Sequence, residues 1–175
     1  CSHPHIVKVH DVIKEGRLWG MVMEYIKGQD LAEYVKQKGK LSEVEALKYI
    51  NQVGTALEYV NQQGMLHRDV NPRYIMLREN QQEAVLIDFG TAREFNPEKT
   101  GSMTNAKTLG YAPIEQYERH GKFGPYTDVY ALAATLYALV TGEKPFESKL
   151  RKYAELPPPK QLTPQISDKV NNGII

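Results

Sequence analysis

Two acid-bearing segments that lie close together in the chain constrain its fold more than any other feature. HRDVNPRYIM occupies residues 67–76 and IDFG occupies residues 87–90, so that Asp69 and Asp88 are only 19 residues apart. Phosphoryl transfer uses two carboxylates in this way. One orients the attacking hydroxyl and accepts its proton, and the other holds Mg²⁺ against the nucleotide phosphates. The fold must therefore bring two short loops to one place.

Composition sets broad limits on the partners of the chain. The 175 residues carry a net charge of +1, from 22 basic and 21 acidic residues, so that no strong field favours nucleic acid. The longest apolar run, at residues 131–140, is shorter than the roughly 20 residues of a membrane helix and indicates a buried helix instead. The single cysteine, Cys1, cannot close an internal disulfide, which is typical of a reducing compartment. We therefore expect one cytoplasmic domain with no membrane segment in this chain.

The first part of the chain predicts strands. β-branched residues at 6–13 and an apolar run at 18–26 indicate a strand pair joined by KEGR. Two shorter apolar runs, at 74–77 and 84–87, indicate small strands on either side of a polar turn.

Two long helices are the clearest prediction of secondary structure. Ser42 and Glu45 form the S-x-x-E pattern of a capping box before a helix that runs to about residue 63. One apolar stripe is expected along it, made of Val44, Leu47, Ile50, Leu57 and Val60. A second, buried helix is expected from about residue 127 to 141. Shorter helices are expected to begin near Asp30 and Ser167, and the Pro-rich stretch at 156–164 is expected to be an extended linker.

Five segments occur in the order typical of eukaryotic-like serine/threonine protein kinases, and the chain resembles that family in its bacterial, cyanobacterial-type form. The segments are HPHIVKVHDV at 3–12, MEYIKGQDL at 23–31, HRDVNP at 67–72, IDFG at 87–90, and GYAPIEQY at 110–117 with TDVYALAATLYALVTGEKPF at 127–146. The resemblance implies an α+β, protein-kinase-like fold: a mainly helical C-lobe with remnant N-lobe strands. Residues 1–26 would be the end of the N-lobe and the start of the hinge. Residues 27–175 would be the C-lobe, truncated before its last helices, so that both ends are expected to be cut from a longer protein.

The resemblance also implies roles for individual residues. Asp69 would be the catalytic base, Arg68 would pair with an activation-loop phosphate, and Asp88 would bind Mg²⁺. Thr108 would contact Asp69, and it and Thr104 are candidate phosphorylation sites. Four further residues have structural roles: His67 and Phe89 in the core, Asp128 holding the catalytic-loop backbone, and Glu115 with an expected arginine partner beyond Ile175.

The same resemblance implies ATP as a substrate and proteins as phosphate acceptors. Adenine would lie between the hinge and an apolar floor, formed by Met23 as gatekeeper, by the backbone of Glu24, Tyr25 and Ile26, and by Met76. The three early histidines, His3, His5 and His10, are interpreted as a turn and surface set rather than a metal site, because no cluster of cysteines or carboxylates completes a coordination shell.

Three departures from the family pattern reduce the expected activity. Asn71 stands where the family has a catalytic-loop lysine, and Tyr74 stands where it has a second metal ligand, so that Tyr74 is a doubtful ligand. A neutral phenol is a poor substitute for an amide oxygen on Mg²⁺. The 175 residues also contain no Gly-rich loop, no VAIK-type lysine and no αC glutamate ahead of the hinge. We expect this chain alone to be inactive.

Two functional classes stay open at this point. Asp69, Asp88 and Arg68 favour an enzyme, whereas Tyr74 and Asn71 favour a pseudokinase that binds or scaffolds. A small-molecule phosphotransferase is disfavoured, because GYAPIEQY resembles the segment that positions a peptide substrate. We also expect marginal stability in the isolated chain. Exposed apolar patches should lie near residues 6–26 and on the helix at 127–141, and Glu115 should lack a partner.

Overall fold

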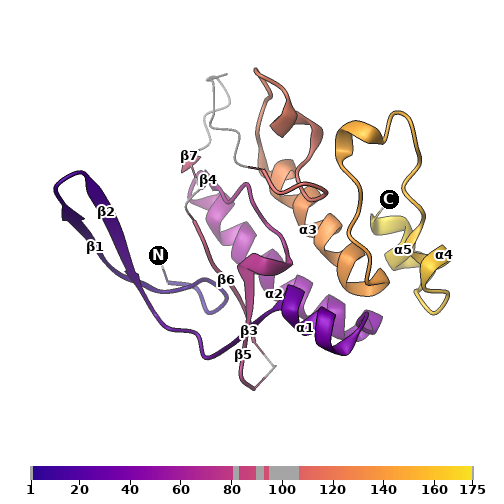
Figure 1. Cartoon of the computed structure of the whole chain (residues 1–175), viewed down its shortest axis with the longest axis horizontal. Coiled ribbons are helices and arrows are strands. Elements are labelled where there is room, and N and C mark those ends of the chain that lie inside the picture. Colours follow the sequence, from indigo (N-terminus) through magenta and orange to yellow (C-terminus); the bar gives the residue numbers. More distant parts are fainter. Residues whose placement is uncertain (1, 81–82, 90–92, 95–106, 175) are drawn as a thin grey trace.

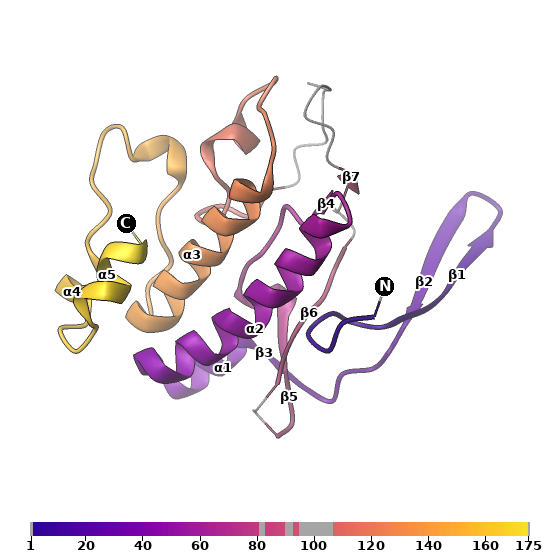
Figure 2. The same cartoon turned by 180° about the vertical axis from the view of Figure 1, so that it is seen from behind.

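Two long helices, α2 (Glu43–Gln62) and α3 (Pro125–Thr141), pack against each other at the centre of the molecule (Figures 1 and 2). The computed structural model describes residues 2–80, 83–89, 93–94 and 107–174. The α+β arrangement that the sequence predicts is present, with the helices packed beside small antiparallel sheets.

Helix α2 follows the predicted pattern with one error. The Ser42 hydroxyl accepts a hydrogen bond from the Glu45 N–H at 3.3 Å, which caps the first turn. The Glu45 carboxylate turns outward and accepts hydrogen bonds from Tyr34 and Lys38. Every third or fourth residue is buried: Ala46, Tyr49, Ile50, Val53, Ala56, Leu57 and Val60. Val44 does not belong to this stripe, because it shares the outer face of the helix with exposed polar residues and is 82% exposed.

Helix α3 is covered on most sides. It begins two residues earlier than predicted because Pro125 suits the first helical position, and it ends at Gly142, whose φ of 75° is left-handed. The expected apolar patch on residues 127–141 is wrong, since Val129 is the one large hydrophobic side chain exposed there. The others face α2, the catalytic loop or the C-terminal segments, and the run ALAATLYALV forms the centre of the core.

A three-stranded antiparallel sheet lies beside α2 in the order β3-β5-β6. Its strands are β3 (Gly28–Asp30), β5 (Ile75–Arg78) and β6 (Ala84–Leu86), so the two predicted short strands are correct to within one residue. Gly28 is required in β3, because a Cβ there would lie 1.8 Å from the Leu77 carbonyl oxygen. A second pairing joins β4 (Met65–Leu66) to β7 (Arg93–Glu94).

The hairpin of β1 (Val9–Glu15) and β2 (Leu18–Met23) projects away from the helices in both views (Figures 1 and 2). All seven residues of β1 are exposed, and Leu18 is 75% exposed. The apolar patch expected within residues 6–26 is therefore confirmed for the hairpin. The residues that flank it differ, since Val7 and Ile26 are buried with Val85.

Shorter elements complete the chain. They are α1 (Leu31–Lys38), capped by Asp30, and η1 (Pro72–Tyr74), η2 (Ile114–Tyr117), η3 (Ser148–Leu150), α4 (Pro159–Leu162) and α5 (Asp168–Ile174). The stretch predicted as an extended linker contains α4. Pro159 occupies the first position of this short helix, where the fixed φ of proline is favourable and its missing N–H costs no hydrogen bond. Within the described ranges, no helix is both long and apolar enough to cross a membrane.

Candidate active site

Asp128 fixes the backbone at the start of the HRD segment. Its carboxylate is fully buried and accepts hydrogen bonds from the His67 N–H at 3.0 Å and the Arg68 N–H at 2.8 Å. A third hydrogen bond, at 3.2 Å, comes from the side-chain amide of Asn61. These bonds hold Arg68 at a φ of 70°, which a non-glycine residue rarely adopts. The family role expected of Asp128 is consistent with this geometry, whereas the contribution of Asn61 was not predicted.

His67 connects the HRD segment to the IDFG segment. Its Nε2 lies 3.1 Å from the Ile87 carbonyl oxygen, and its ring packs edge-on against Phe89 at 4.8 Å. Burial lowers the pKa of His67, with nearby carboxylates acting in the opposite direction, so the ring is neutral near pH 7. A neutral ring with its proton on Nε2 donates to Ile87, and its Nδ1 accepts the Asp69 N–H at 3.3 Å.

Asp69 is held by the two residues that the sequence assigned to its neighbourhood. The Thr108 hydroxyl donates to Asp69 Oδ1 at 2.6 Å, and the Asn71 amide donates to the same oxygen at 3.3 Å and to the Asp69 carbonyl at 2.9 Å. Asn71 is 2% exposed, and its own side-chain oxygen accepts the Arg73 N–H at 3.0 Å, which caps η1. Asn71 therefore orients the Asp69 carboxylate, although it carries no charge toward the site.

Tyr74 and Asp88 lie beside each other on the opposite side. The Ile87 N–H donates to the Tyr74 carbonyl at 2.9 Å, which aligns the two segments, and Asp88 has a φ of 61°. Burial raises the pKa of Tyr74, and the charges of Asp69 and Asp88 together with a hydrogen bond to Asp88 raise it further. The phenol is therefore neutral at pH 7 and donates to the Asp88 carboxylate. Asp69 and Asp88 thus both raise the pKa of the Tyr74 phenol.

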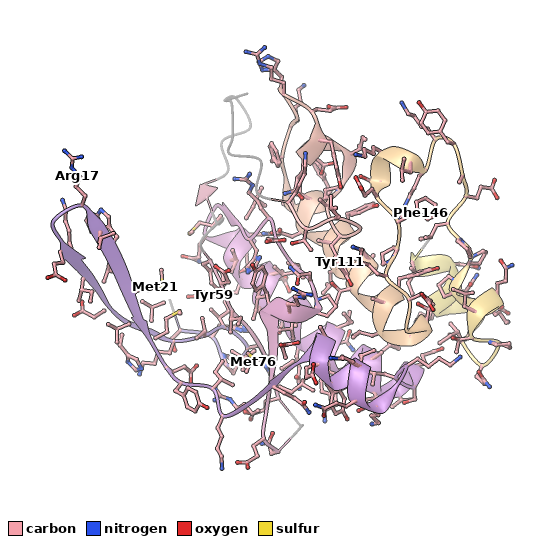
Figure 3. All side chains as sticks on the ribbon, in the orientation of Figure 1. Arg17, Met21, Tyr59, Met76, Tyr111 and Phe146 are labelled. Carbon is pink, nitrogen blue, oxygen red and sulfur yellow. The ribbon has the colours of Figure 1, made fainter. Side chains whose placement is uncertain are left out.

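A cavity of about 530 Å³ opens between the hairpin and the sheet. All five residues predicted to contact adenine line it, together with Tyr74 and Asp88. Sequence reasoning missed four apolar residues of the lining: Val7, Met21, Ile87 and Phe89. Figure 3 shows two of the side chains that border it, Met21 from the hairpin and Met76 from β5. Tyr25 is 88% exposed, so it offers its backbone rather than its ring to this cavity.

A second cavity, of about 480 Å³, lies on the other side of Tyr74. Its lining includes Asn71 and Thr108, the two residues that contact the Asp69 carboxylate. Tyr74 lines both cavities and therefore separates them.

The segment GYAPIEQY is hydrogen-bonded to the HRD segment. The Gln116 side chain donates to the Arg68 carbonyl at 2.9 Å, a contact that the sequence did not predict. Glu115 was expected to lack its arginine partner, and no ion pair of Glu115 is found among the described residues; the Thr127 hydroxyl donates to its carboxylate at 2.8 Å instead. A buried threonine near the start of α3 thus supplies a local hydrogen bond. Thr104, one candidate phosphorylation site, lies outside the described residues.

The early histidines have packing roles in the structure. His3 stacks on Tyr59 with ring centroids 5.5 Å apart, and His5 Nδ1 lies 2.9 Å from the Ala84 carbonyl oxygen. His10 is exposed on the hairpin.

Comparison with known proteins agrees with this geometry. Residues 1–170 match the family model of the protein kinase domain, and the chain therefore belongs to the protein kinase family. It is 31% identical to the serine/threonine-protein kinase PrkC of Bacillus subtilis, over 99% of this chain and 28% of that protein. It is 35% identical to the serine/threonine-protein kinase PkaA of Streptomyces coelicolor, over 83% of this chain and 27% of that protein.

A plant protein, the serine/threonine-protein kinase ATG1a of Arabidopsis thaliana, is 31% identical over 83% of this chain and 23% of that protein. The chain thus spans about a quarter of the length of the curated relatives it matches. The predicted resemblance to eukaryotic-like serine/threonine kinases, bacterial ones included, is confirmed. The finer assignment to a cyanobacterial type stays a prediction, as does the division between N-lobe and C-lobe at residue 27. Kinases of this family use ATP and Mg²⁺.

Proposed function

We propose that the protein carrying this chain transfers the γ-phosphoryl group of ATP to serine or threonine hydroxyls of other proteins. The observation that carries the proposal is the position of Asp69. Its carboxylate is oriented by Asn71 and Thr108, and these two residues border a cavity that shares Tyr74 with the cavity beside Asp88. One cavity would hold the nucleotide, and the other would hold the segment that presents the hydroxyl.

Each side chain has one task in this proposal. Asp69 orients the acceptor hydroxyl and takes its proton, while Asn71 and Thr108 keep the carboxylate in position. Met23, Met76 and the backbone of residues 24–26 enclose the adenine, and Arg68 receives an activation-loop phosphate. ATP as the phosphoryl donor and the lack of an internal disulfide favour the cytoplasm as the place of reaction.

The residues fit one Mg²⁺ and not a second. Mg²⁺ needs one or two protein carboxylates, with phosphate oxygens and water completing its shell, and Asp88 offers such a carboxylate. Across the described residues there is no group of three or more His, Cys, Asp or Glu side chains that would form a complete protein cage. The neutral phenol of Tyr74 offers a hydrogen-bond donor rather than a ligand. When bound, the ion would neutralise charge on the phosphates.

The 175 residues alone should be almost silent. Removal of one preorganised electrostatic group typically costs roughly 10²–10³ in rate. The family's lysine, Gly-rich loop and second metal ligand are all missing from this stretch, so we expect a loss above ~10⁵, even though such effects are not additive. A rate of about 1–100 s⁻¹ from these residues alone would overturn that expectation.

The test compares Asp69→Asn and Asp88→Asn in the protein that carries the chain. Phosphate transfer from radiolabelled ATP to a mixed library of serine and threonine peptides should fall at least ~10³-fold in Asp69→Asn, with nucleotide binding unchanged. In Asp88→Asn, the Mg²⁺-dependent part of nucleotide binding should disappear as well. Asp168→Asn, at an 81% exposed position on α5, is the matched control. Wild-type transfer by Asp69→Asn would refute the assignment.

A second candidate function is a pseudokinase that binds partners without transferring phosphate. The contact between the Tyr74 phenol and Asp88 favours it, because the phenol stands in the position where the family has a metal ligand. The two functions differ in one measurement. An enzyme binds ATP more tightly when Mg²⁺ is added and incorporates phosphate, whereas a pseudokinase of this type binds ATP equally with and without Mg²⁺ and incorporates none.

A further inference from the structure

The cavity beside Asp69 carries two positive charges and no negative one. Its lining consists of Ala32, Asn71, Pro72, Arg73, Tyr74, Thr108, Leu109, Tyr111 and Lys144, so that Arg73 and Lys144 are its only charged residues within the described part of the chain. Both are exposed at the surface end of their side chains. A groove with charges of a single sign selects ligands of the opposite sign.

Arg73 is an exposed residue of the cavity lining. It lies in η1, directly after the catalytic loop, and its N–H is held by the Asn71 side chain. Its guanidinium acts electrostatically on the phenols of both Tyr74 and Tyr111, lowering the pKa of each against the larger effect of burial. The guanidinium therefore lies near both rings, which line the same cavity.

Lys144 reaches the same cavity from the loop after α3. Its aliphatic carbons Cγ and Cε pass 3.3 and 3.2 Å from the position that a Cβ of Gly110 would occupy. Gly110 has a φ of 89°, and a Cβ there would also lie 2.3 Å from the Pro145 carbonyl oxygen, so only glycine lets the lysine cross the Thr108–Tyr111 segment. Figure 3 shows Tyr111 next to α3.

Neither cation is neutralised by the described part of the protein. No carboxylate in the described ranges lies within ion-pair distance of Arg73 or Lys144. Glu147 lies within electrostatic range of Lys144, but its carboxylate is bound to Lys149 at 2.9 Å. The neighbouring cation Lys107 is directed elsewhere, with its Nζ 4.2 Å from the centre of the Tyr117 ring.

We propose that this cavity is an anion-selective subsite, in which Arg73 and Lys144 bind a carboxylate or phosphate on a substrate residue within two positions of the acceptor hydroxyl. The inference rests on the proposed function and names its substrate class: acidic or already phosphorylated serine/threonine peptides. Asn71 and Thr108 lie between the subsite and Asp69, so a peptide that reaches both cations presents its neighbouring hydroxyl to the Asp69 carboxylate.

The test uses the protein that carries the chain and matched peptides. Each peptide has one serine acceptor, flanked at one of the two positions on either side by glutamate, phosphoserine, glutamine or lysine. We expect kcat/KM for the glutamate peptide to exceed that for the glutamine peptide by about threefold to tenfold, as two partly exposed ion pairs allow. The preference should shrink when salt is raised from 0.05 to 0.3 M, because such pairs are screened.

Variants connect the preference to the two side chains. Arg73→Gln/Lys144→Gln should lower the preference below twofold, chiefly by lowering kcat/KM for the glutamate peptide. Lys152→Gln removes a charge outside the cavity, where Lys152 lies 4.7 Å from the centre of the Tyr153 ring, and should leave the preference intact. A preference that persists in the double variant, or equal use of anionic and neutral peptides by the unaltered protein, would overturn the inference.

The phosphoserine peptide distinguishes the two sources of negative charge. A kcat/KM above that of the glutamate peptide identifies substrates phosphorylated beforehand, and an equal or lower value identifies acidic sequences. A parallel measurement separates failure of the subsite from failure of the proposed function. Fluorescence anisotropy with labelled peptides that carry alanine at the acceptor position reports binding alone. Anion-dependent binding without phosphate transfer would retain the subsite and reject the kinase activity, and transfer without anion preference would do the reverse.

Discussion

The two acids of the site have different surroundings, although they lie only 19 residues apart. On the base side, Asp69 accepts hydrogen bonds from Thr108 and Asn71, and the backbone before it is held by the buried carboxylate of Asp128. On the metal side, Asp88 is exposed and contacts the phenol of Tyr74. On the base side the carboxylate is held by hydrogen bonds from within this chain, although Asn71 replaces the family's lysine, whereas the metal side has a hydrogen-bond donor where the family has a ligand.

This difference indicates that orientation of the acceptor and binding of the metal are separable properties of the fold. The hydrogen bonds around Asp69 and the backbone before it involve the HRD segment, α2, α3, Thr108 and Gln116. The groups around Asp88 come from η1 and from the end of the edge strand β6, and the cavity beside them is lined in part by the exposed hairpin. A change on the base side should therefore alter stability as well as activity, and a change on the metal side should alter activity alone.

The largest expected effect is on the base side. Asp128→Ala removes a buried carboxylate and leaves the His67 N–H, the Arg68 N–H and the Asn61 amide without their acceptor. We expect the free energy of unfolding to fall by about 3–5 kcal/mol, measured by urea denaturation. Asp168→Ala, at an exposed ion pair with Lys160, should cost no more than about 1 kcal/mol. Equal losses in the two variants would contradict the anchoring role.

The next effect tests the metal side directly. Tyr74→Asn replaces the phenol with an amide oxygen that can bind Mg²⁺ beside Asp88. In the protein that carries the chain, we expect Mg²⁺-dependent phosphate transfer to rise by about 10- to 100-fold, with the midpoint of thermal unfolding nearly unchanged. Tyr74→Phe is the matched control, because it removes the hydroxyl and supplies no ligand. If Phe raises the rate as much as Asn does, the phenolic hydroxyl itself is the obstacle and the missing ligand is irrelevant.

The sequence predicted the elements whose signals are local. The caps at Asp30 and Ser42, the buried helix at 131–140 and the two short strands all appear in the structure, because each depends on residues within one turn or one strand. The contact between Thr108 and Asp69 that the resemblance implied is present in the structure, whereas the hydrogen bonds from Asn71 to Asp69 were not predicted. The position of Val44 was misjudged because a spacing of three and four fits more than one helix face.

Contacts between distant segments could not be predicted. Asn61 binds Asp128 across 67 residues, Gln116 binds Arg68 across 48, and Thr127 takes the partner position at Glu115. Nothing in a single sequence marks an asparagine near a helix end as a ligand of a buried acid. The place of Tyr74 between two cavities depends likewise on the pairing of residues 74 and 87, which is a property of the tertiary fold.

A pH experiment gives a smaller effect on the base side. Burial lowers the pKa of His67 in the folded protein below its ordinary value of 6.5, so the unfolded chain binds more protons near and below that pH. Stability is therefore fully present above pH 6.5 and falls as the pH is lowered. Between pH 7 and 5.5 we expect the free energy of unfolding to fall, by no more than about 1.4 kcal/mol per pH unit from this one residue, and urea denaturation at each pH measures the fall.

The pH experiment needs a control at His3, the other histidine whose pKa is lowered in the folded protein. Burial and the neighbouring His5 lower the pKa of His3, which acts in the same direction on a more exposed ring. His3→Gln should therefore keep most of the pH dependence, and His67→Asn should lose most of it. The reverse outcome would show that the first histidine, and not the HRD histidine, responds to acid.

The smallest expected effect lies outside both sides of the site, on the hairpin. Leu18 is 75% exposed on β2, and its apolar surface contributes little to folding, so Leu18→Ser should change the free energy of unfolding by less than about 0.5 kcal/mol. Leu139 is fully buried in α3, and Leu139→Ala should cost about 2–5 kcal/mol. Light scattering should show less aggregation in Leu18→Ser, because an exposed apolar strand edge promotes association. A large loss of stability in Leu18→Ser would mean that the hairpin packs against the core in solution. Because the hairpin lines the cavity beside Asp88, the metal side would then be as firmly packed as the base side.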